Sequence, residues 1–298
     1  MGEHGAPTPP EYPHELQVLA DSYLDSLAFP GSEGVPGLVE AMRYSLLAGG
    51  KRIRPVLAMA TAEALGGSAD SVLPFAAAVE MIHTYSLIHD DLPAMDDDDL
   101  RRGLPTLHKR SSEAVAILAG DCLYAEAFSH LLSHQAGEPK AVASAAAQLA
   151  RATGVDGMVG GQFIDVEGIA GPGVPGLELL HSLKTGRLIR ASADCVTVLM
   201  ESTAQQTVAI AGFSKELGVL FQIVDDILDV EGSDAELGKP VGSDEKQGKR
   251  TFVTELGLEG AREMAEQRHI AATSCLSEMG DEATRLRAIA DHVWTRSS

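Results

Sequence analysis

Two clusters of aspartates are the residues of this 298-residue sequence best suited to do chemistry. The first, "HDDLPAMDDDDLRRG" at 89–103, follows the apolar run "FAAAVEMIHTYSLI", and the second, "FQIVDDILDVEG", occupies 221–232. Crowded carboxylates repel one another and raise each other's pKa unless a cation lies between them. Such oxygen ligands suit Mg²⁺, which keeps several waters and uses one or two carboxylates together with substrate phosphate. Two facing clusters could therefore hold metal ions around one polyanionic ligand.

In the first cluster, the acids can meet only if the helix that carries them ends. Asp90 and Asp96 would stand about 120° apart on an unbroken helix. Pro93 cannot donate a hydrogen bond to the preceding turn, so we expect a bulge or a helix end near 92–95. That break would bring Asp96 round to face Asp90 and Asp91.

The second cluster needs no break, because Asp225 and Asp229 are about 40° apart on a helix and both point from one face. Gln222 is a polar side chain in an apolar run on a nearby face, and we expect it to serve the same cavity. A solvated acidic turn that caps the following helix would explain Asp97 to Asp99 without any ligand. That explanation is weaker for two clusters that each end a long apolar helix.

Basic residues gather beside the acids. The stretch "GGKRIRP" at 49–55 brings Lys51, Arg52 and Arg54 together after a Gly-Gly helix stop. Lysine supplies a point charge and arginine a planar fork, the usual pairing for phosphate, although one such cluster alone is often a solvated loop. His83, about 20° off the helical line of Asp90, could face the same cavity or simply be a core residue. Further cations are Arg101, Arg102, Lys184, Lys239 and Lys249.

The elements that position these residues are predicted to be helices. Hydrophobic residues make up 45% of the chain and aromatic residues only 4%, and alternating β-branched runs are scarce. Gly- and Pro-rich breaks separate helix-length segments without an interdomain linker. We therefore predict an all-α fold in which residues 1–298 form one domain, with about the first 13 residues disordered. Segments expected at the centre of a bundle, because they are apolar nearly all round, are 71–92, 113–132, 141–152 and 208–230.

Charge and motifs argue against several function classes. A net charge of -20 disfavours nucleic acid and anionic membranes. The start lacks a signal-peptide pattern and no uncharged apolar run has the length of a membrane span, so we expect a soluble, cytoplasmic protein without stable membrane insertion. The separated cysteines, Cys122, Cys195 and Cys275, suggest neither disulfides nor zinc. No Walker loop or GxGxxG motif points to a nucleotide. A diphosphate whose other end enters an apolar interior, as in a prenyl chain, is the ligand that remains.

Several motifs in order carry a family resemblance over nearly the whole chain: "GGKRIRP", "IHDDLPAMDDDDLRRGLPTLH", "ILAGD", "GGQFID", "LKTGRLI", "FQIVDDILD" and "GKPVGSDEKQGK". They resemble the trans-prenyltransferases of the isoprenyl diphosphate synthase, or polyprenyl synthetase, family, most closely the bacterial farnesyl diphosphate synthases. The resemblance implies the isoprenoid-synthase helical bundle around a central cavity, mostly as a homodimer. It also implies head-to-tail condensation of isopentenyl diphosphate with dimethylallyl or geranyl diphosphate, through metal-assisted ionisation, condensation and proton loss.

The resemblance also implies roles for individual residues. Mg²⁺, usually three ions, would be held with the allylic diphosphate by Asp90, Asp91, Asp96, Asp225 and Asp229. The diphosphate of isopentenyl diphosphate would be held by Lys51, Arg54, His83 and Arg102. The allylic diphosphate would contact Arg101, Lys184, Lys239 and Lys249. Thr185 and Gln222 would lie near the developing carbocation, and Gln162 and Asp165 also match family positions. The residues expected to act in catalysis are Lys184, Thr185, Gln222, Asp90 and Asp225.

Product length is expected to depend on Tyr85, with its neighbour Ser86. In the family an aromatic residue five positions before the first aspartate usually forms the floor of the pocket and stops the chain at fifteen carbons. Tyr85 could instead be an ordinary core residue. The resemblance thus favours farnesyl diphosphate as product, with geranylgeranyl or another short-chain diphosphate as the alternative. A class I terpene cyclase is disfavoured by "DDILD", and a non-catalytic prenyltransferase subunit by the presence of both acidic motifs.

Overall fold

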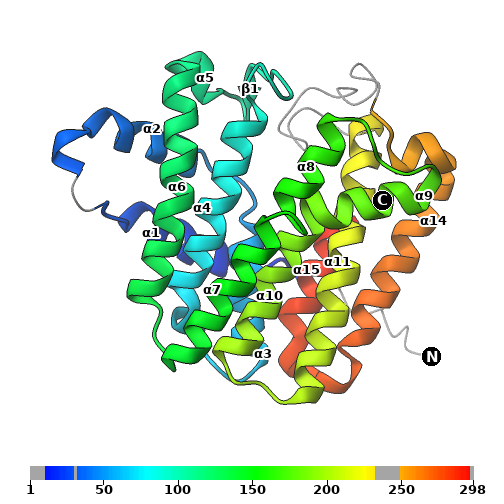
Figure 1. Ribbon diagram of the computed structural model, residues 1–298. Helices are drawn as coiled ribbons and strands as arrows, with labels where there is room; N and C mark the ends of the chain where they lie inside the picture. The colour runs from blue at the N-terminus through cyan, green and yellow to red at the C-terminus, as the bar shows by residue number, and fades with distance from the viewer. Residues whose placement is uncertain (1–10, 30–31, 232–248, 296–298) are drawn as a thin grey trace, which may run out of the picture.

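Helices form nearly all of the regular structure, as the sequence predicts (Figure 1). The computed structural model describes residues 11–29, 32–231 and 249–295. The elements in chain order are α1 (His14–Ser26), the 3-10 turn η1 (Ser32–Gly34), α2 (Pro36–Leu46), α3 (Ile53–Ala64), the 3-10 turn η2 (Ala69–Val72), α4 (Leu73–Asp90), β1 (Leu100–Arg101), β2 (Leu104–Pro105), α5 (Leu107–Arg110), α6 (Glu113–His134), α7 (Pro139–Thr153), α8 (Met158–Val166), α9 (Gly173–His181), the π-helical turn η3 (Ser182–Gly186), α10 (Arg187–Leu199), α11 (Ala204–Glu231), α14 (Phe252–Cys275), the 3-10 turn η4 (Ser277–Ala283) and α15 (Thr284–Thr295).

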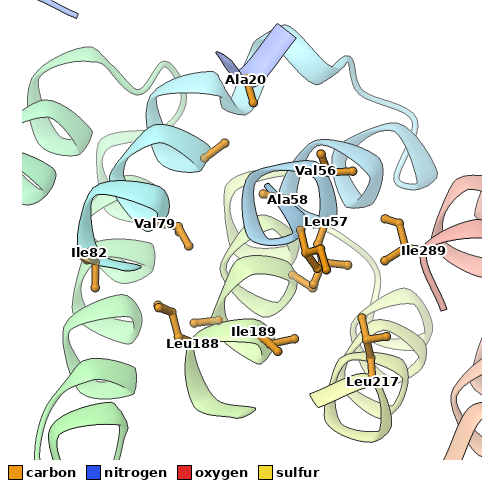
Figure 2. Close-up of a cluster of buried hydrophobic side chains, with 14 of the residues drawn as sticks. Ala20, Val56, Leu57, Ala58, Val79, Ile82, Leu188, Ile189, Leu217 and Ile289 are labelled. Atoms are coloured by element: carbon orange, nitrogen blue, oxygen red, sulfur yellow. The ribbon is translucent and has the colours of Figure 1, made fainter. Parts of the chain in front are cut away.

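Helix α3 lies at the centre of the hydrophobic core. Its sequence, "IRPVLAMATAEA", is mostly small or apolar, and Val56, Leu57 and Met59 are completely buried. Small side chains let helices pack closely, and α3 contacts α1, α4, α10 and α15. Figure 2 shows side chains of α3 among those of its neighbours, which include Val79, Ile82, Leu188, Ile189, Leu217 and Ile289. The core therefore holds α4, α10 and α11 firmly, and the candidate site is built at or beside the ends of these helices.

The four apolar segments are all helical, but not all of them are central. α4 packs on α6 at one side of the bundle and α11 on α14 at the other (Figure 1). The prediction that the segment 113–132 is central is wrong, because α6 leaves Ile117, Leu118 and Leu132 43%, 57% and 57% exposed. α6 packs one face against the bundle and turns the other outward.

Within residues 11–29, 32–231 and 249–295, three helices are long and apolar enough to span a membrane on length and composition alone: Ala69–Asp90, Glu113–His134 and Ala204–Glu231. In the most apolar window of Ala69–Asp90, 67% of the residues are buried inside the bundle. Core packing therefore accounts for the hydropathy of this helix. The absence of stable membrane insertion stays a prediction.

The start of the described chain is ordered two residues earlier than the sequence predicts. Tyr12 is only 6% exposed, and its hydroxyl donates to the backbone carbonyl of Lys51 over 2.8 Å. Pro13 is also buried. The prediction of disorder to about residue 13 is therefore wrong for these two residues, while residues 1–10 lie outside the described part of the chain.

A short hairpin, rather than a helix, follows the first acidic cluster. β1 and β2 pair antiparallel, with Leu100 opposite Pro105. The expected helix capping by Asp97 to Asp99 is wrong: the carboxylate of Asp98 pairs with Arg101 at 3.0 Å and that of Asp99 with Lys109 at 2.7 Å. The expected solvation holds for Asp97 and Asp99, which are both exposed.

Candidate active site

One cavity of about 500 Å³, a size typical of small-molecule sites, gathers most of the predicted residues. It lies where the C-terminal end of α4 meets α8, η3 and α11. Its acidic lining residues are Asp90, Asp96, Asp165, Asp225 and Asp226. Its cationic lining residues are Arg54, Arg101, Lys184, Lys249 and Arg250. Apolar side chains that complete the wall include Leu87, Met158, Val159, Phe163, Val166 and Phe221. Charged and apolar side chains thus line one space.

The first acidic wall forms where α4 stops. The helix ends at Asp90, and the backbone N–H of Asp96 donates to the carbonyl of Asp90 over 2.9 Å. The helix thus ends two residues before the predicted range of 92–95, and the turn that follows places both carboxyl groups at the cavity, as predicted. Asp91 is directed elsewhere: it is 4% exposed, it is absent from the cavity lining, and it accepts hydrogen bonds of 2.9 and 2.5 Å from Arg101. The metal-binding role of Asp91 stays a prediction.

Burial raises the pKa of Asp90 to about 6. The neighbouring carboxylates of Asp96 and Asp91 act in the same direction, while Lys184 and Arg101 oppose the rise. The ionised form of Asp90 is therefore costly in this wall, and a bound cation would offset that cost.

The second wall uses a different pair of acids from the one that spacing predicts. Asp225 and Asp226 line the cavity, whereas Asp229 is 3% exposed and is absent from the lining residues. Asp226 accepts one hydrogen bond from the Gln222 amide at 2.8 Å and another from the backbone N–H of Phe252 at 2.7 Å. Asp226 therefore joins α11 to the start of α14 and orients Gln222. Sequence reasoning missed this role, although the i, i+4 spacing of Gln222 and Asp226 on a helix was a usable signal.

Lys184 and Thr185 lie on the π-helical turn η3, a local irregularity often found at functional sites. The Lys184 ammonium is 2.5 Å from the Asp165 carboxylate, and the Thr185 hydroxyl donates to the Gln222 amide oxygen over 3.3 Å. Gly161 on α8 makes this packing possible, because a Cβ there would lie 2.2 Å from the backbone nitrogen of Lys184. The second glycine of "GGQFID" thus allows α8 to approach η3.

The remaining cationic side of the cavity contains Arg54, His83, Arg101 and Lys249. Burial lowers the pKa of Arg54 to about 10, so it stays charged at neutral pH. Its Nε is buried and has no hydrogen-bond partner among the described residues. Burial and the nearby arginines lower the pKa of His83, which leaves a neutral imidazole at the cavity. Lys249 contacts the Asp96 carboxylate at 3.0 Å, which closes the first acidic wall with a cation.

Two further predicted cations do not line the large cavity. Arg102 donates to the backbone carbonyl of Gly49 and lines a much smaller adjacent pocket. It lies so close to Gly50 that a Cβ there would meet its guanidinium carbon at 2.6 Å. Lys51, which follows Gly50 in the sequence, is half-buried, and Lys239 lies outside the described residues. Their substrate-binding roles stay predictions.

The predicted chain-length residues, Tyr85 and Ser86, both line the cavity. The Tyr85 ring makes edge contacts with His89 and Tyr124, at centroid distances of 4.9 and 5.1 Å. The Tyr124 hydroxyl lies 3.0 Å from that of Thr153 on α7. Sequence reasoning missed Tyr124, because only the packing of α6 on α4 brings it to Tyr85.

Gln162 on α8 lines the same cavity. Its amide oxygen and nitrogen are buried and have no hydrogen-bond partner within the described ranges. Buried polar atoms of this kind are costly unless a ligand or water pairs with them. Gln162 is therefore available to a polar ligand in the cavity.

Comparison with known proteins agrees with this geometry. Residues 35–290 match the polyprenyl synthetase family. The chain is 47% identical over 269 residues to the farnesyl diphosphate synthase of Geobacillus stearothermophilus, covering 87% of this chain and 89% of that protein. It is 46% identical over 263 residues to the chloroplastic geranylgeranyl pyrophosphate synthase of Capsicum annuum, covering 87% and 71%.

Among solved structures, the geranyltransferase of Helicobacter pylori, complexed with magnesium and isoprenyl diphosphate, matches with a TM-score of 0.83 and 32% identity over 95% of each chain. The sequence match covers most of the chain, and the structural match shows the same helical bundle. The chain therefore belongs to the polyprenyl synthetase family and is a short-chain trans-prenyltransferase.

Proposed function

We propose that this chain is a farnesyl diphosphate synthase, which joins isopentenyl diphosphate to dimethylallyl and geranyl diphosphate. The observation that carries the proposal is a single cavity lined by both acidic walls, by cations and by Tyr85. The charged lining residues suit two diphosphates, and the apolar lining residues suit a growing prenyl tail.

The donor set fits a hard divalent cation. Asp90, Asp96 and Asp225 present carboxyl oxygens to one cavity, and the raised pKa of Asp90 reflects burial that a cation would offset. Carboxylates with substrate phosphate are the ligands Mg²⁺ prefers. When bound, Mg²⁺ would stabilise the negative charge of the leaving diphosphate. The family resemblance suggests three ions.

The chain's own residues bind and orient the allylic diphosphate. Lys184, Lys249 and Arg101 neutralise the charge that grows on the leaving group as the allylic carbon to oxygen bond ionises. The hydroxyl of Thr185 and the amide oxygen of Gln222 are joined at 3.3 Å and offer partial negative charge to the carbocation. Asp226 fixes the orientation of Gln222.

The second substrate lies against the other cations. Arg54 offers a buried Nε, and neutral His83 offers a ring N–H to the diphosphate of isopentenyl diphosphate. Lys51 and Arg102 complete this subsite. The double bond attacks the carbocation, and the departed diphosphate, held by Lys184 and the other allylic-side cations, takes the proton that is lost. Half-buried apolar side chains of the lining, such as Phe221, would limit the access of water to the carbocation.

Tyr85 favours a fifteen-carbon product. It lies on α4 about one and a half turns before Asp90, in the wall along which the tail would grow. Its ring is held by contacts to His89 and Tyr124, so it cannot swing aside freely. A geranylgeranyl product is the second candidate, which the 46% identity to the plant synthase favours.

We further propose a cytoplasmic homodimer. The outward face of α6 exposes Ile117, Leu118 and Leu132, and the loop after α7 exposes 87% of Val155. Apolar patches of this kind commonly mark interfaces.

The three free cysteines suit a reducing compartment such as the cytoplasm. Light scattering after size-exclusion chromatography tests the dimer, and a monomer at micromolar concentration would contradict it.

The experiment that tests the activity uses the purified protein with Mg²⁺, isopentenyl diphosphate and either dimethylallyl or geranyl diphosphate. Products are dephosphorylated and separated against chain-length standards. We expect farnesol as the main product from both allylic substrates. Geranylgeraniol as the main product would replace the proposal by its alternative, and hydrocarbon from geranyl diphosphate alone would indicate a cyclase.

A further inference from the structure

Arg52 differs from the two cations beside it in "GGKRIRP", because it points into the protein. Its side chain is 1% exposed, and its backbone has a φ of 51°, in the left-handed region that side-chain-bearing residues rarely adopt. Arg52 is also the residue from which α3 starts, and Arg54 lies in the first turn of that helix. The conformation at Arg52 therefore sets the direction in which Arg54 leaves the turn.

Two acids hold Arg52 in this conformation. Its Nη1 contacts the Glu80 carboxylate of α4 at 2.6 Å, and its Nε contacts the Asp21 carboxylate of α1 at 2.8 Å. A further hydrogen bond of 2.8 Å joins Nη2 to the carbonyl of Leu46 at the end of α2. Glu80 is 1% exposed. Buried ion pairs add little net stability, but their fixed geometry can specify the position of a loop.

The segment around α1 contacts three consecutive residues, 50–52, of the turn that precedes α3. The Tyr12 hydroxyl donates to the Lys51 carbonyl at 2.8 Å, and the Gln17 amide donates to the Gly50 carbonyl at 2.9 Å. Asp21 accepts from the Arg52 side chain. These partners stand at residues 12, 17 and 21, and all of them face the turn rather than the cavity.

The contacting segment also precedes residues 35–290, the stretch that matches the family model. We propose that Tyr12, Gln17 and Asp21 are positioning residues of the isopentenyl diphosphate subsite. They hold the backbone of Gly50 to Arg52 so that Lys51 and Arg54 meet the diphosphate together. This inference rests on the proposed function, which assigns Lys51 and Arg54 to that diphosphate.

The test uses a double variant with one change just before α1 and one change within α1. Tyr12→Phe with Asp21→Asn removes one hydroxyl contact and weakens one ion pair at the turn, and it leaves Arg52 bound to Glu80. Replacing Arg52 itself would leave the buried Glu80 without its cation and could prevent folding. The matched control is Tyr23→Phe with Asp25→Asn. In α1 the Tyr23 hydroxyl lies 3.0 Å from His130 and Asp25 contacts Arg43 at 2.8 Å, so the control loses the same chemical groups away from the turn.

We expect the double variant at Tyr12 and Asp21 to raise KM for isopentenyl diphosphate about three- to tenfold, as the loss of one or two hydrogen bonds would. KM for the allylic diphosphate should stay within about twofold. The control pair should leave both KM values within about twofold. An unchanged KM for isopentenyl diphosphate, or an equal rise in both KM values or in the control, would overturn the inference.

Calorimetric binding of isopentenyl diphosphate separates this inference from the proposed activity. If the wild-type protein does not join the two substrates, the proposed function fails, and binding still compares the two double variants. Three- to tenfold weaker binding only in the variant at Tyr12 and Asp21 supports the positioning role. Equal binding by both double variants contradicts it.

Discussion

The two acidic walls of the cavity are made in different ways. On the α4 side the helix stops, and a turn brings Asp96 to Asp90, whose pKa is raised to about 6 by burial. On the α11 side the helix continues to Glu231. There Asp226 accepts hydrogen bonds from Gln222 and from the backbone of Phe252. The α4 wall thus carries a buried negative charge that a cation would stabilise. The α11 wall uses the Asp226 carboxylate to hold Gln222 and the start of α14 in place.

The difference teaches that a run of aspartates is not one functional unit. Adjacent acids can serve different roles. Asp90 lines the cavity, whereas Asp91 does not and pairs with Arg101. Asp226 is hydrogen-bonded to Gln222 and Phe252, although it lies beside Asp225. The substitutions below test which acids belong to the ligand and which to the fold.

The largest effect is expected when one ligand-facing acid of either wall is removed. Asp90→Ala and Asp225→Ala should each lower kcat about a hundredfold to a thousandfold, because lost electrostatic stabilisation of the leaving group costs about 3 to 4 kcal/mol. Steady-state rates and circular dichroism would be measured together, since the fold should stay intact. Asp70→Ala, at an exposed acid before the other end of α4, is the control. Near-normal rates in both cavity variants would contradict the assignment.

A second test separates the walls by pH. Since the pKa of Asp90 is raised to about 6, protons compete with Mg²⁺ for this carboxyl group below that pH. The apparent affinity for Mg²⁺ should fall about tenfold per pH unit below 6, and higher Mg²⁺ should restore the rate. Initial rates across a Mg²⁺ titration at pH 7, 6 and 5 check this. A Mg²⁺ requirement that stays constant over that range would count against the first wall as the site of proton competition.

A third test predicts opposite effects on stability. Ionisation of Asp90 costs free energy as the pH rises through about 6, so the amide of Asp90→Asn should stabilise the metal-free protein at pH 7.5 by about 1 kcal/mol. Asp226→Asn should destabilise it by about 1 to 3 kcal/mol, because it weakens two buried hydrogen bonds.

Urea unfolding in the presence of a chelator measures both changes. At pH 4.5 the advantage of Asp90→Asn should be smaller, and it should vanish only below the ordinary pKa of 3.8, where the carboxyl group is protonated in the unfolded chain as well. The distinction between the walls would be lost if the two variants changed stability in the same direction at pH 7.5.

The smallest effect on rate concerns Tyr85, which only the α4 wall carries. Tyr85→Ala should keep turnover within about tenfold and add a twenty-carbon product, since the wall opens beside Tyr124. Tyr85→Phe keeps the ring and is the control, and it should retain the fifteen-carbon product. Chromatography against chain-length standards reads the outcome. An unchanged product from Tyr85→Ala would contradict the proposal that Tyr85 limits the length of the prenyl chain.

Much of the fold and part of the site could be predicted from the sequence. Local signals were sufficient for the helix end before Pro93 and for the placement of Asp90, Asp96 and Asp225 at one cavity. The role of Asp226 could not be predicted, because its partner Phe252 lies 26 residues later and reaches it only when α14 docks on α11.

Apolar composition likewise did not distinguish core from surface. The segments Ala69–Asp90 and Glu113–His134 have the same mean hydropathy of 1.3, yet 67% of the first window and 33% of the second are buried. The hydropathy of a helix records that its side chains avoid water, and it does not say whether another helix of the same chain covers them.

The hydrogen bond from the N–H of Asp96 to the carbonyl of Asp90 fixes the length of the turn between these two residues. Ala94 between them is exposed, so its side chain can change with little consequence, whereas Pro93 also keeps the helix from continuing. The number of residues between Asp90 and Asp96 cannot change in the same way, because a deletion or insertion would turn the Asp96 carboxyl group away from Asp90. For anyone redesigning this enzyme, the length of this segment is thus a stricter constraint than the identity of its exposed residues.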